Sequence, residues 1–156
     1  MINQTQTPLI TMSRSFRAKV VKIWIMGTDL SAAQGAMRLT EVAVTNGFIR
    51  RDKSVLGTTL TSWNIGKVET PLWAAKAALS MLLESEWMPS NDEEWAGFAT
   101  LFLTMNKSTQ LADLLMLLPQ RLASHVAVTG WLCAAIEEME RFNVVKWYEK
   151  KLGKFA

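Results

Sequence analysis

The stretch Leu56-Gly-Thr-Thr-Leu-Thr-Ser-Trp-Asn-Ile-Gly-Lys-Val-Glu-Thr-Pro71, with the apolar run that follows it to Leu82, indicates two helices joined by a short loop. Leu56, Leu60 and Trp63 repeat at spacings of four and three residues, which places them on one face of a helix. The Ser54 hydroxyl can accept a hydrogen bond from the free N–H groups at the start of that helix. The pattern therefore predicts a first helix of about three turns.

The loop contains the residues that end this helix and begin the next. Gly66 can adopt the left-handed conformation that commonly terminates a helix. Thr70 is suited to cap the second helix, and Pro71 to occupy its first position, where its missing N–H costs nothing. This helix should run from Pro71 to about Glu84. Its inward-facing residues are predicted to be Leu72, Ala75, Leu79, Leu82 and Leu83.

Residues 1–12 are polar and are expected to form a flexible arm. The first helix should begin near Ser13 or Ser15 and end at Gly27. Its basic residues are predicted to lie largely on the faces that point away from the core: Arg14, Arg17, Lys19 and Lys22. They would form a solvated face or contact phosphates.

Two capping boxes mark further helix starts. Ser31 with Gln34 predicts a helix over residues 32–45, and Ser90 with Glu93 predicts another after a break at residues 87–89. The acidic residues at this second start are explained by capping and the helix dipole rather than by catalysis.

The C-terminal half shows apolar stripes at helical spacing. Ser108 is a candidate cap for the helix that carries the second stripe, and residues 122–136 are apolar almost all round, which predicts a central helix or a dimer seam. Residues 141–154 are expected to form an amphipathic terminal helix. The stripes comprise Trp95, Phe98, Phe102 and Met105, then Leu111, Leu114, Leu115 and Leu118; the solvated acidic face comprises Glu137, Glu138 and Glu140.

The predicted fold class is therefore all-α, with an N-terminal helix-turn-helix-like bundle packed on or linked to a C-terminal helical bundle. The expected division is an arm over residues 1–12, a helix-turn-helix-like DNA-binding region over residues 13–86, and a helical bundle over residues 90–156. The last of these is a possible dimerisation region.

No pattern of catalytic or metal-binding residues stands out. Cys133 is the single cysteine, which excludes an internal disulfide and a multi-cysteine metal site, and we expect it to be buried. His125 has no nucleophile or carboxylate at a telling spacing. The longest apolar run, residues 126–136, is about half of a membrane span. We expect a cytoplasmic, non-enzymatic protein without cofactor, metal or membrane contact.

Charge is distributed unevenly along the chain, whose net charge is +3. Residues 13–76 contain ten basic and four acidic residues, a net charge of +6. Residues 77–140 contain two basic and nine acidic residues, a net charge of −7, and residues 141–156 contain five basic and one acidic, a net charge of +4. Positive charge on the helix-turn-helix candidate is what phosphate contact requires.

The candidate DNA-contacting residues lie within and beside the opening stretch. Arg50, Arg51 and Lys53 form a short basic linker just before it, and Lys67 lies in its loop. Between them, short polar side chains that can donate and accept hydrogen bonds at base edges or phosphates occupy the outward face of the predicted helix. These side chains are Thr58, Thr59, Thr61, Ser62 and Asn64.

The same stretch resembles the recognition helix and following loop of the Cro and phage-repressor class of helix-turn-helix domains. The features in common are Leu60, Trp63, Gly66-Lys67, Pro71 and Trp73-Ala-Ala. The resemblance implies that Thr58, Thr59, Thr61 and Ser62 face the major groove, with Gln34 opening the preceding helix. It departs from the family at residues 48–53, which are an insertion where the family has a turn of a few residues.

These features predict a DNA-binding transcriptional regulator of phage or plasmid type that binds double-stranded DNA, as a homo-oligomer joined through its C-terminal bundle. The alternative is a non-enzymatic helical subunit or adaptor of a larger nucleoprotein assembly, or a phage inhibitor of host defence. Seven tryptophans and nine methionines favour a surface that binds protein partners.

Overall fold

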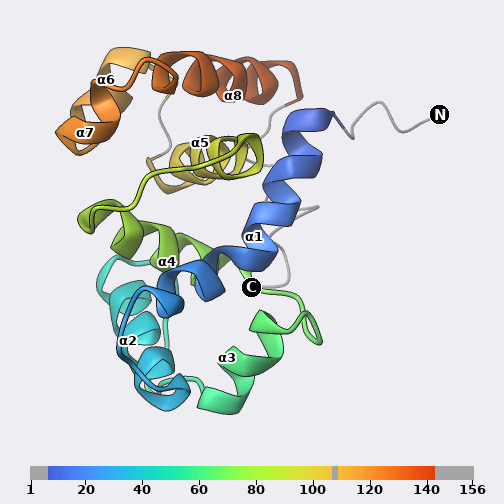
Figure 1. The fold of residues 1–156 in the computed structure, drawn as a ribbon, viewed down its shortest axis with the longest axis vertical. Helices are drawn as coiled ribbons and strands as arrows, with labels where there is room; N and C mark the ends of the chain where they lie inside the picture. Colours follow the sequence, from blue (N-terminus) through green and yellow to red (C-terminus); the bar gives the residue numbers. More distant parts are fainter. Residues whose placement is uncertain (1–6, 107–108, 143–156) are drawn as a thin grey trace.

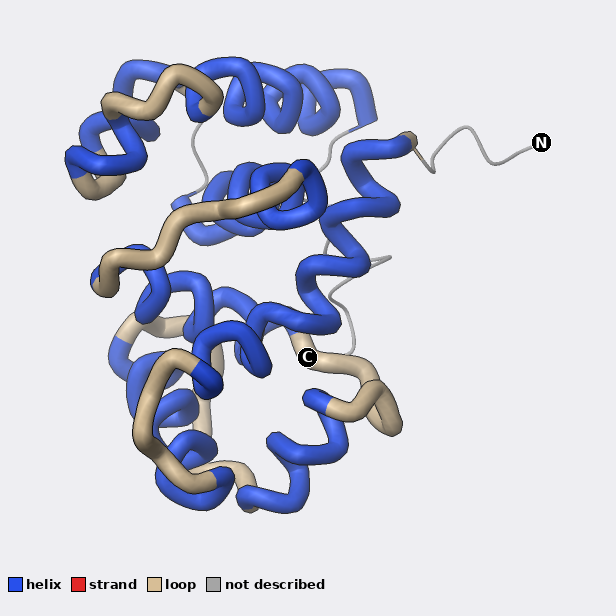
Figure 2. The backbone as a smooth tube through the Cα atoms, in the orientation of Figure 1, coloured by secondary structure: helices blue, strands red, loops and turns tan. Residues whose placement is uncertain are grey.

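The computed structural model describes residues 7–106 and 109–142, and within them the chain is all-α (Figure 1). Helix and loop account for the whole of this part, with no strand (Figure 2). The fold class predicted from the sequence is confirmed. The described residues form eight helices: α1 Pro8–Met26, α2 Ala32–Thr45, α3 Gly57–Asn64, α4 Leu72–Glu84, α5 Asp92–Asn106, α6 Leu111–Met116, α7 Gln120–Ala123 and α8 Val128–Phe142.

The helices stack along the long axis of the molecule, with α2 and α3 at one end and α6, α7 and α8 at the other (Figure 1). Helices α4 and α5 lie between these ends, and α1 runs alongside and packs mainly against both. Ten consecutive residues of α5, 95–104, are buried, and α4 is buried on nearly every side. The five inward-facing residues predicted for α4 are all buried.

Of the two alternatives predicted for residues 122–136, the central helix is wrong, and the dimer seam stays a prediction. The chain there is divided into α7 and α8, and α8 lies at the surface over α5 with an exposed outer face. Cys133 belongs to that exposed face, so its predicted burial is also wrong. Glu138 is instead buried, contrary to the solvated acidic face expected there. An apolar run does not show which helix is central, because that depends on the helices packed around it.

Helix α1 begins earlier than predicted. Thr7 caps it by accepting a hydrogen bond from the N–H of Ile10 at 3.3 Å, and Pro8 is its first residue, so the predicted arm over residues 1–12 is too long. Ser13 is not a cap but a fully buried residue within the helix. Residues 1–6 lie outside the described part of the chain.

A very close crossing of α1 and α5 defines the centre of the fold. A Cβ atom added at Gly97 would lie 2.2 Å from the Phe16 ring, so only glycine permits this approach. The buried Ser13 hydroxyl donates to the Ala96 carbonyl at 3.1 Å and accepts from the Thr100 hydroxyl at 2.8 Å. These bonds satisfy polar groups that would otherwise be costly to bury.

The predicted caps are confirmed in one case and shifted in another. Ser31 and Gln34 form the reciprocal capping box of α2, which spans the residues predicted. For α5, the cap is Asn91, which accepts from the N–H of Glu94, while Glu94 accepts from the N–H of Ser90. The cap is therefore one residue later than predicted, and Glu94 rather than Glu93 accepts a backbone N–H at this helix start, from Ser90 rather than from the cap residue. The predicted cap Ser108 lies outside the described residues.

The two regions predicted from the sequence share one apolar core, because α1 packs against α5 across the expected boundary. Arg121 of α7 adds a polar connection by donating to the carbonyls of Leu82, Leu83 and Trp87 at 2.9 to 3.3 Å. A cation at the C-terminal end of a helix is favourable because the last carbonyls of α4 lack partners within the helix.

Gly97→Ala should destabilise the protein although alanine is the better helix former. Alanine is favoured over glycine within a helix by about 1 kcal/mol. The clash of the new methyl group with Phe16 should cost about 2 kcal/mol or more, because the nearest atoms of Phe16 include its Cβ and Cγ, which cannot move freely. Chemical denaturation measures the difference in the free energy of unfolding between wild type and the variant. Gly130→Ala in α8 is the matched control, because no atom lies within 4 Å of the added Cβ. Equal effects of the two substitutions would contradict the close crossing.

Glu93→Gln should weaken the acid dependence of stability. Burial acts to raise the pKa of Glu93, but hydrogen bonds from Lys19 and Ser15 and the charge of Lys19 outweigh it and leave the pKa lowered. The stability that this lowered pKa contributes is fully present above the pKa of Glu93 in the unfolded chain, near 4.5. It is lost as the pH falls through the lower pKa of Glu93 in the folded protein. Urea unfolding should give a larger free energy of unfolding for wild type than for the variant at pH 7, and this difference should shrink as the pH falls below 4.5. A constant difference between them would contradict this account.

Candidate nucleic-acid interface

Helix α3 is short and is anchored by two side chains. It spans Gly57–Asn64, with Leu60 1% and Trp63 5% exposed, as the spacing predicted. Trp63 packs edge-on against Trp73 of α4, with ring centroids 5.6 Å apart. Leu56 is 69% exposed, so its predicted place on the buried face is wrong. Apolar packing by Leu60 and Trp63 therefore orients α3 and leaves its opposite face to solvent.

The start of α3 differs from the prediction. Leu56 is the cap residue and makes no side-chain capping bond, so Ser54 is not the cap. The backbone at residue 57 lies against the first turn of α2: a Cβ on Gly57 would be 2.8 Å from the backbone nitrogen of Ala33. The helix therefore starts at a contact with α2 and without a hydroxyl cap.

The end of α3 agrees with the prediction, whereas the start of α4 is displaced by one residue. Gly66 has φ 78°, and the N–H of Lys67 donates to the Ser62 carbonyl at 2.9 Å, which closes the helix end. Pro71 is the cap of α4 rather than its first residue, and the buried Thr70 is not the cap.

The linker of residues 46–56 returns along α2. Its first part is held by a hydrogen bond from Phe48 N–H to the Ala43 carbonyl, and its last part by one from Val55 N–H to the Thr40 hydroxyl. Helix α3 therefore begins beside the first turn of α2, whereas a tight helix-turn-helix places the second helix directly after the last turn of the first. The insertion expected from the sequence thus changes how the two helices follow one another.

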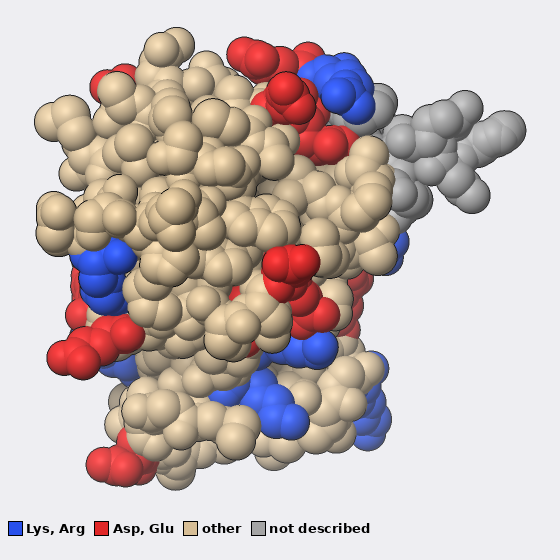
Figure 3. Space-filling model, turned by 45° about the horizontal axis from the view of Figure 1, so that its top comes forward, with Lys and Arg blue, Asp and Glu red and all other residues tan. Residues whose placement is uncertain are grey.

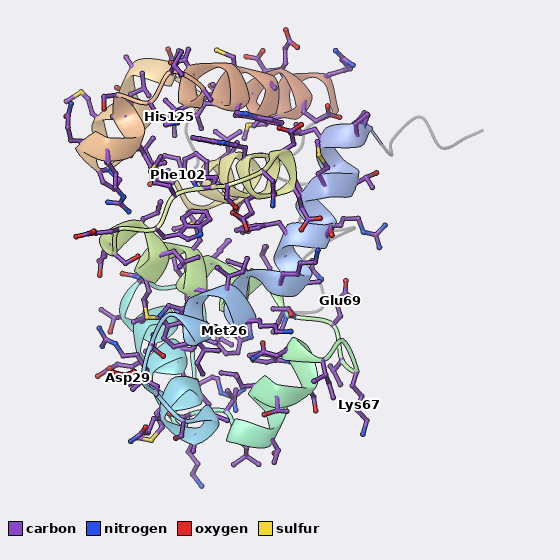
Figure 4. All side chains as sticks on the ribbon, viewed as in Figure 1. Met26, Asp29, Lys67, Glu69, Phe102 and His125 are labelled. Carbon is purple, nitrogen blue, oxygen red and sulfur yellow. The ribbon has the colours of Figure 1, made fainter. Side chains whose placement is uncertain are left out.

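The predicted DNA-contacting residues are all accessible to some degree. Arg50, Arg51 and Lys53 are exposed in the linker, where the Arg51 Nε donates to the Lys53 carbonyl at 3.0 Å. Lys67 is exposed beyond the C-terminal end of α3 (Figure 4). On α3 and at its end, Thr58 and Thr61 are exposed, and the half-exposed residues are Thr59, Ser62 and Asn64.

Charge on this end of the molecule is mixed but mainly positive. In the view of Figure 3, most Lys and Arg side chains lie in the lower half, whereas acidic side chains occur in both halves. Arg38 is paired with Glu41 at 2.8 Å, and Arg17 with Glu69, so these cations are already partly neutralised. Arg17 is buried, contrary to its predicted position on a face away from the core. Arg50 and Lys67 have no ion-pair partner within residues 7–106 and 109–142.

A groove beside α3 was not predicted from the sequence. It lies between the last turns of α1 and the end of α3, and its volume is about 480 Å³. The basic, solvent-facing pattern of α1 indicated one wall, but nothing local in the sequence places the end of α3 opposite it. The lining residues are Ala18, Lys19, Lys22, Ile23, Met26, Asn64, Ile65 and Gly66.

No group of three or more His, Cys, Asp or Glu side chains is placed to hold a metal ion within residues 7–106 and 109–142. His125 packs against Trp95, with ring centroids 5.0 Å apart, and its Nδ1 accepts from the N–H of Ala127 at 3.0 Å. Across the same described ranges, no helix has the length and apolar character needed to cross a bilayer.

Comparisons with protein-family models, characterised protein sequences and solved structures find no match to this chain.

Proposed function

We propose that this protein binds double-stranded DNA through the end of the molecule formed by α3 and the linker before it, as a regulator of phage or plasmid type. The observation that supports the proposal is the joint exposure of hydroxyls on α3 and of cations on both sides of it. Cations contact phosphates without regard to sequence, and short polar side chains contact base edges. The protein would act in the cytoplasm without catalysing a reaction.

The proposed contacts follow from the geometry of α3. The major groove is about 12 Å wide and admits an α-helix, whose diameter with side chains is about 10–12 Å, and α3 presents eight residues to it. Thr58 and Thr61 lie one turn apart on the exposed side and would reach base edges, with Thr59, Ser62 and Asn64 at the flanks. Arg50, Arg51, Lys53 and Lys67 would contact the phosphates on either side.

This mode of binding differs from a tight helix-turn-helix. Because α3 begins beside the first turn of α2, α2 would not cross the DNA backbone in the manner of the Cro and phage-repressor class. Anchoring by Leu60 and Trp63 would supply the rigidity that the turn supplies in that class. A homo-oligomer joined through the C-terminal helices would present two copies of α3 to paired half-sites.

A titration of labelled duplex DNA at several salt concentrations tests the proposal. Arg50→Ala and Lys67→Ala should each make the negative slope of log affinity against log salt shallower by about 0.9, the value for one lost phosphate contact. Arg14→Ala is the matched control, an exposed cation on the N-terminal half of α1. The proposal is wrong if the wild-type protein shows no salt-dependent binding, or if the two test variants bind like the control.

A second candidate function is an adaptor or subunit of a nucleoprotein assembly, or an inhibitor of host defence, that binds another protein. The specific observation in its favour is the exposure of large apolar side chains beside α3, where Met26 is 73% and Ile65 69% exposed. Large exposed apolar groups that gather in one place commonly mark binding surfaces.

A further inference from the structure

The groove between α1 and α3 is lined by both apolar and basic side chains. Ile23 and Met26 of α1 face Ile65 at the end of α3, and together they line the cavity of about 480 Å³. Met26, labelled in Figure 4, lies in the last turn of α1. Met26 and Ile65 come from segments far apart in the sequence, so their apolar surfaces meet only in the folded protein. Isolated exposed apolar residues are ordinary, but several lining one groove are not.

Both walls of the groove are held by packing elsewhere. Helix α1 is held by its close crossing with α5 and by the ion pair of Arg17 with Glu69. Helix α3 is held by the burial of Leu60 and Trp63 on its other side. The groove therefore exists before any partner arrives, and binding would not require ordering of its walls.

The charged side chains that line the groove are all basic. Lys19 and Lys22 line the groove, and no acidic residue does. Lys19 is paired with Glu93 at 2.9 Å, whereas Lys22 is exposed and has no ion-pair partner within residues 7–106 and 109–142. A complementary occupant would present apolar groups to Ile23, Met26 and Ile65 and negative charge to Lys22.

We propose that this groove binds an acidic amphipathic helix of a protein partner. The wall from Ala18 to Met26 is about 12 Å long, which matches two turns of a helix with apolar residues at spacings of three and four. Carboxylates beside the apolar stripe of that helix would lie next to Lys22. The phosphates of a nucleic acid would pair with the lysines, but they would leave the apolar side chains of the groove without apolar contacts. The groove shares Asn64 with the flank of the proposed DNA surface, whereas Thr58, Thr61 and the linker do not line it.

Methyl NMR on the full chain with ¹³C-labelled methionine provides the test. One probe is a synthetic helical peptide of about 14 residues with a leucine stripe flanked by glutamates. A second peptide is identical except that lysines replace the glutamates. The acidic peptide should shift the Met26 signal and leave that of Met116, an exposed methionine in α6, unchanged. The lysine-flanked peptide should bind at least about tenfold more weakly, the effect expected for loss of a favourable charge contact and gain of a repulsive one.

Two variants locate the binding and its charge preference. Ile65→Glu should weaken binding of the acidic peptide about tenfold or more, as for an apolar anchor of an interface, whereas Met116→Glu should not. Both residues are exposed, so neither substitution should disturb the core, and equal thermal unfolding temperatures of the two variants and wild type are the check. Lys22→Glu should reverse the preference between the two peptides.

Three results would overturn the proposal. The first is that the acidic peptide does not shift the Met26 methyl signal. The second is that both peptides bind the wild-type protein equally. The third is that duplex DNA shifts the Met26 methyl signal and the acidic peptide does not. The last result would assign the groove to nucleic acid. Peptide binding and duplex binding are measured separately, so each proposal can fail alone.

Discussion

Where α1 crosses α5, the Phe16 ring occupies the space that any side chain at position 97 would need. Glycine at this point lets two helix backbones approach so closely that the Ser13 and Thr100 hydroxyls bond to each other across the crossing. The close approach holds α1 along the molecule, in contact with both α4 and α5. The buried apolar residues consequently form one cluster from α2 and α3 at one end to α8 at the other.

The two proposed binding surfaces both derive from this arrangement. Because the N-terminal half of α1 is held against α5, its last two turns extend toward α3 and carry Lys22 and Met26 to the surface. Helix α3 is anchored there by Leu60 and Trp63, so its outer face carries the exposed hydroxyls and its end forms a wall of the groove. One short helix thus separates a polar surface suited to nucleic acid from an apolar groove suited to protein.

The sequence predicted the roles of residues that contact their chain neighbours more accurately than the roles of residues that contact distant parts of the chain. The Ser31–Gln34 box and the Gly66 helix stop were predicted because capping involves atoms a few residues apart. The start of α3 was wrong because it depends on the contact between Gly57 and Ala33, which belong to different helices. The burial of Arg17 was missed because its ion-pair partner, Glu69, lies far along the chain.

The sequence by itself determined the all-α class, the bounds of α2, and the inward direction of Leu60 and Trp63, because helical periodicity and caps are set by neighbouring residues. It also indicated which polar residues of α3 face outward. Only the tertiary structure decided that α4 and α5 are central, that α8 exposes Cys133, and that the linker returns α3 to the first turn of α2. These features depend on which helix faces pack together, and that choice is made by contacts between residues distant in sequence.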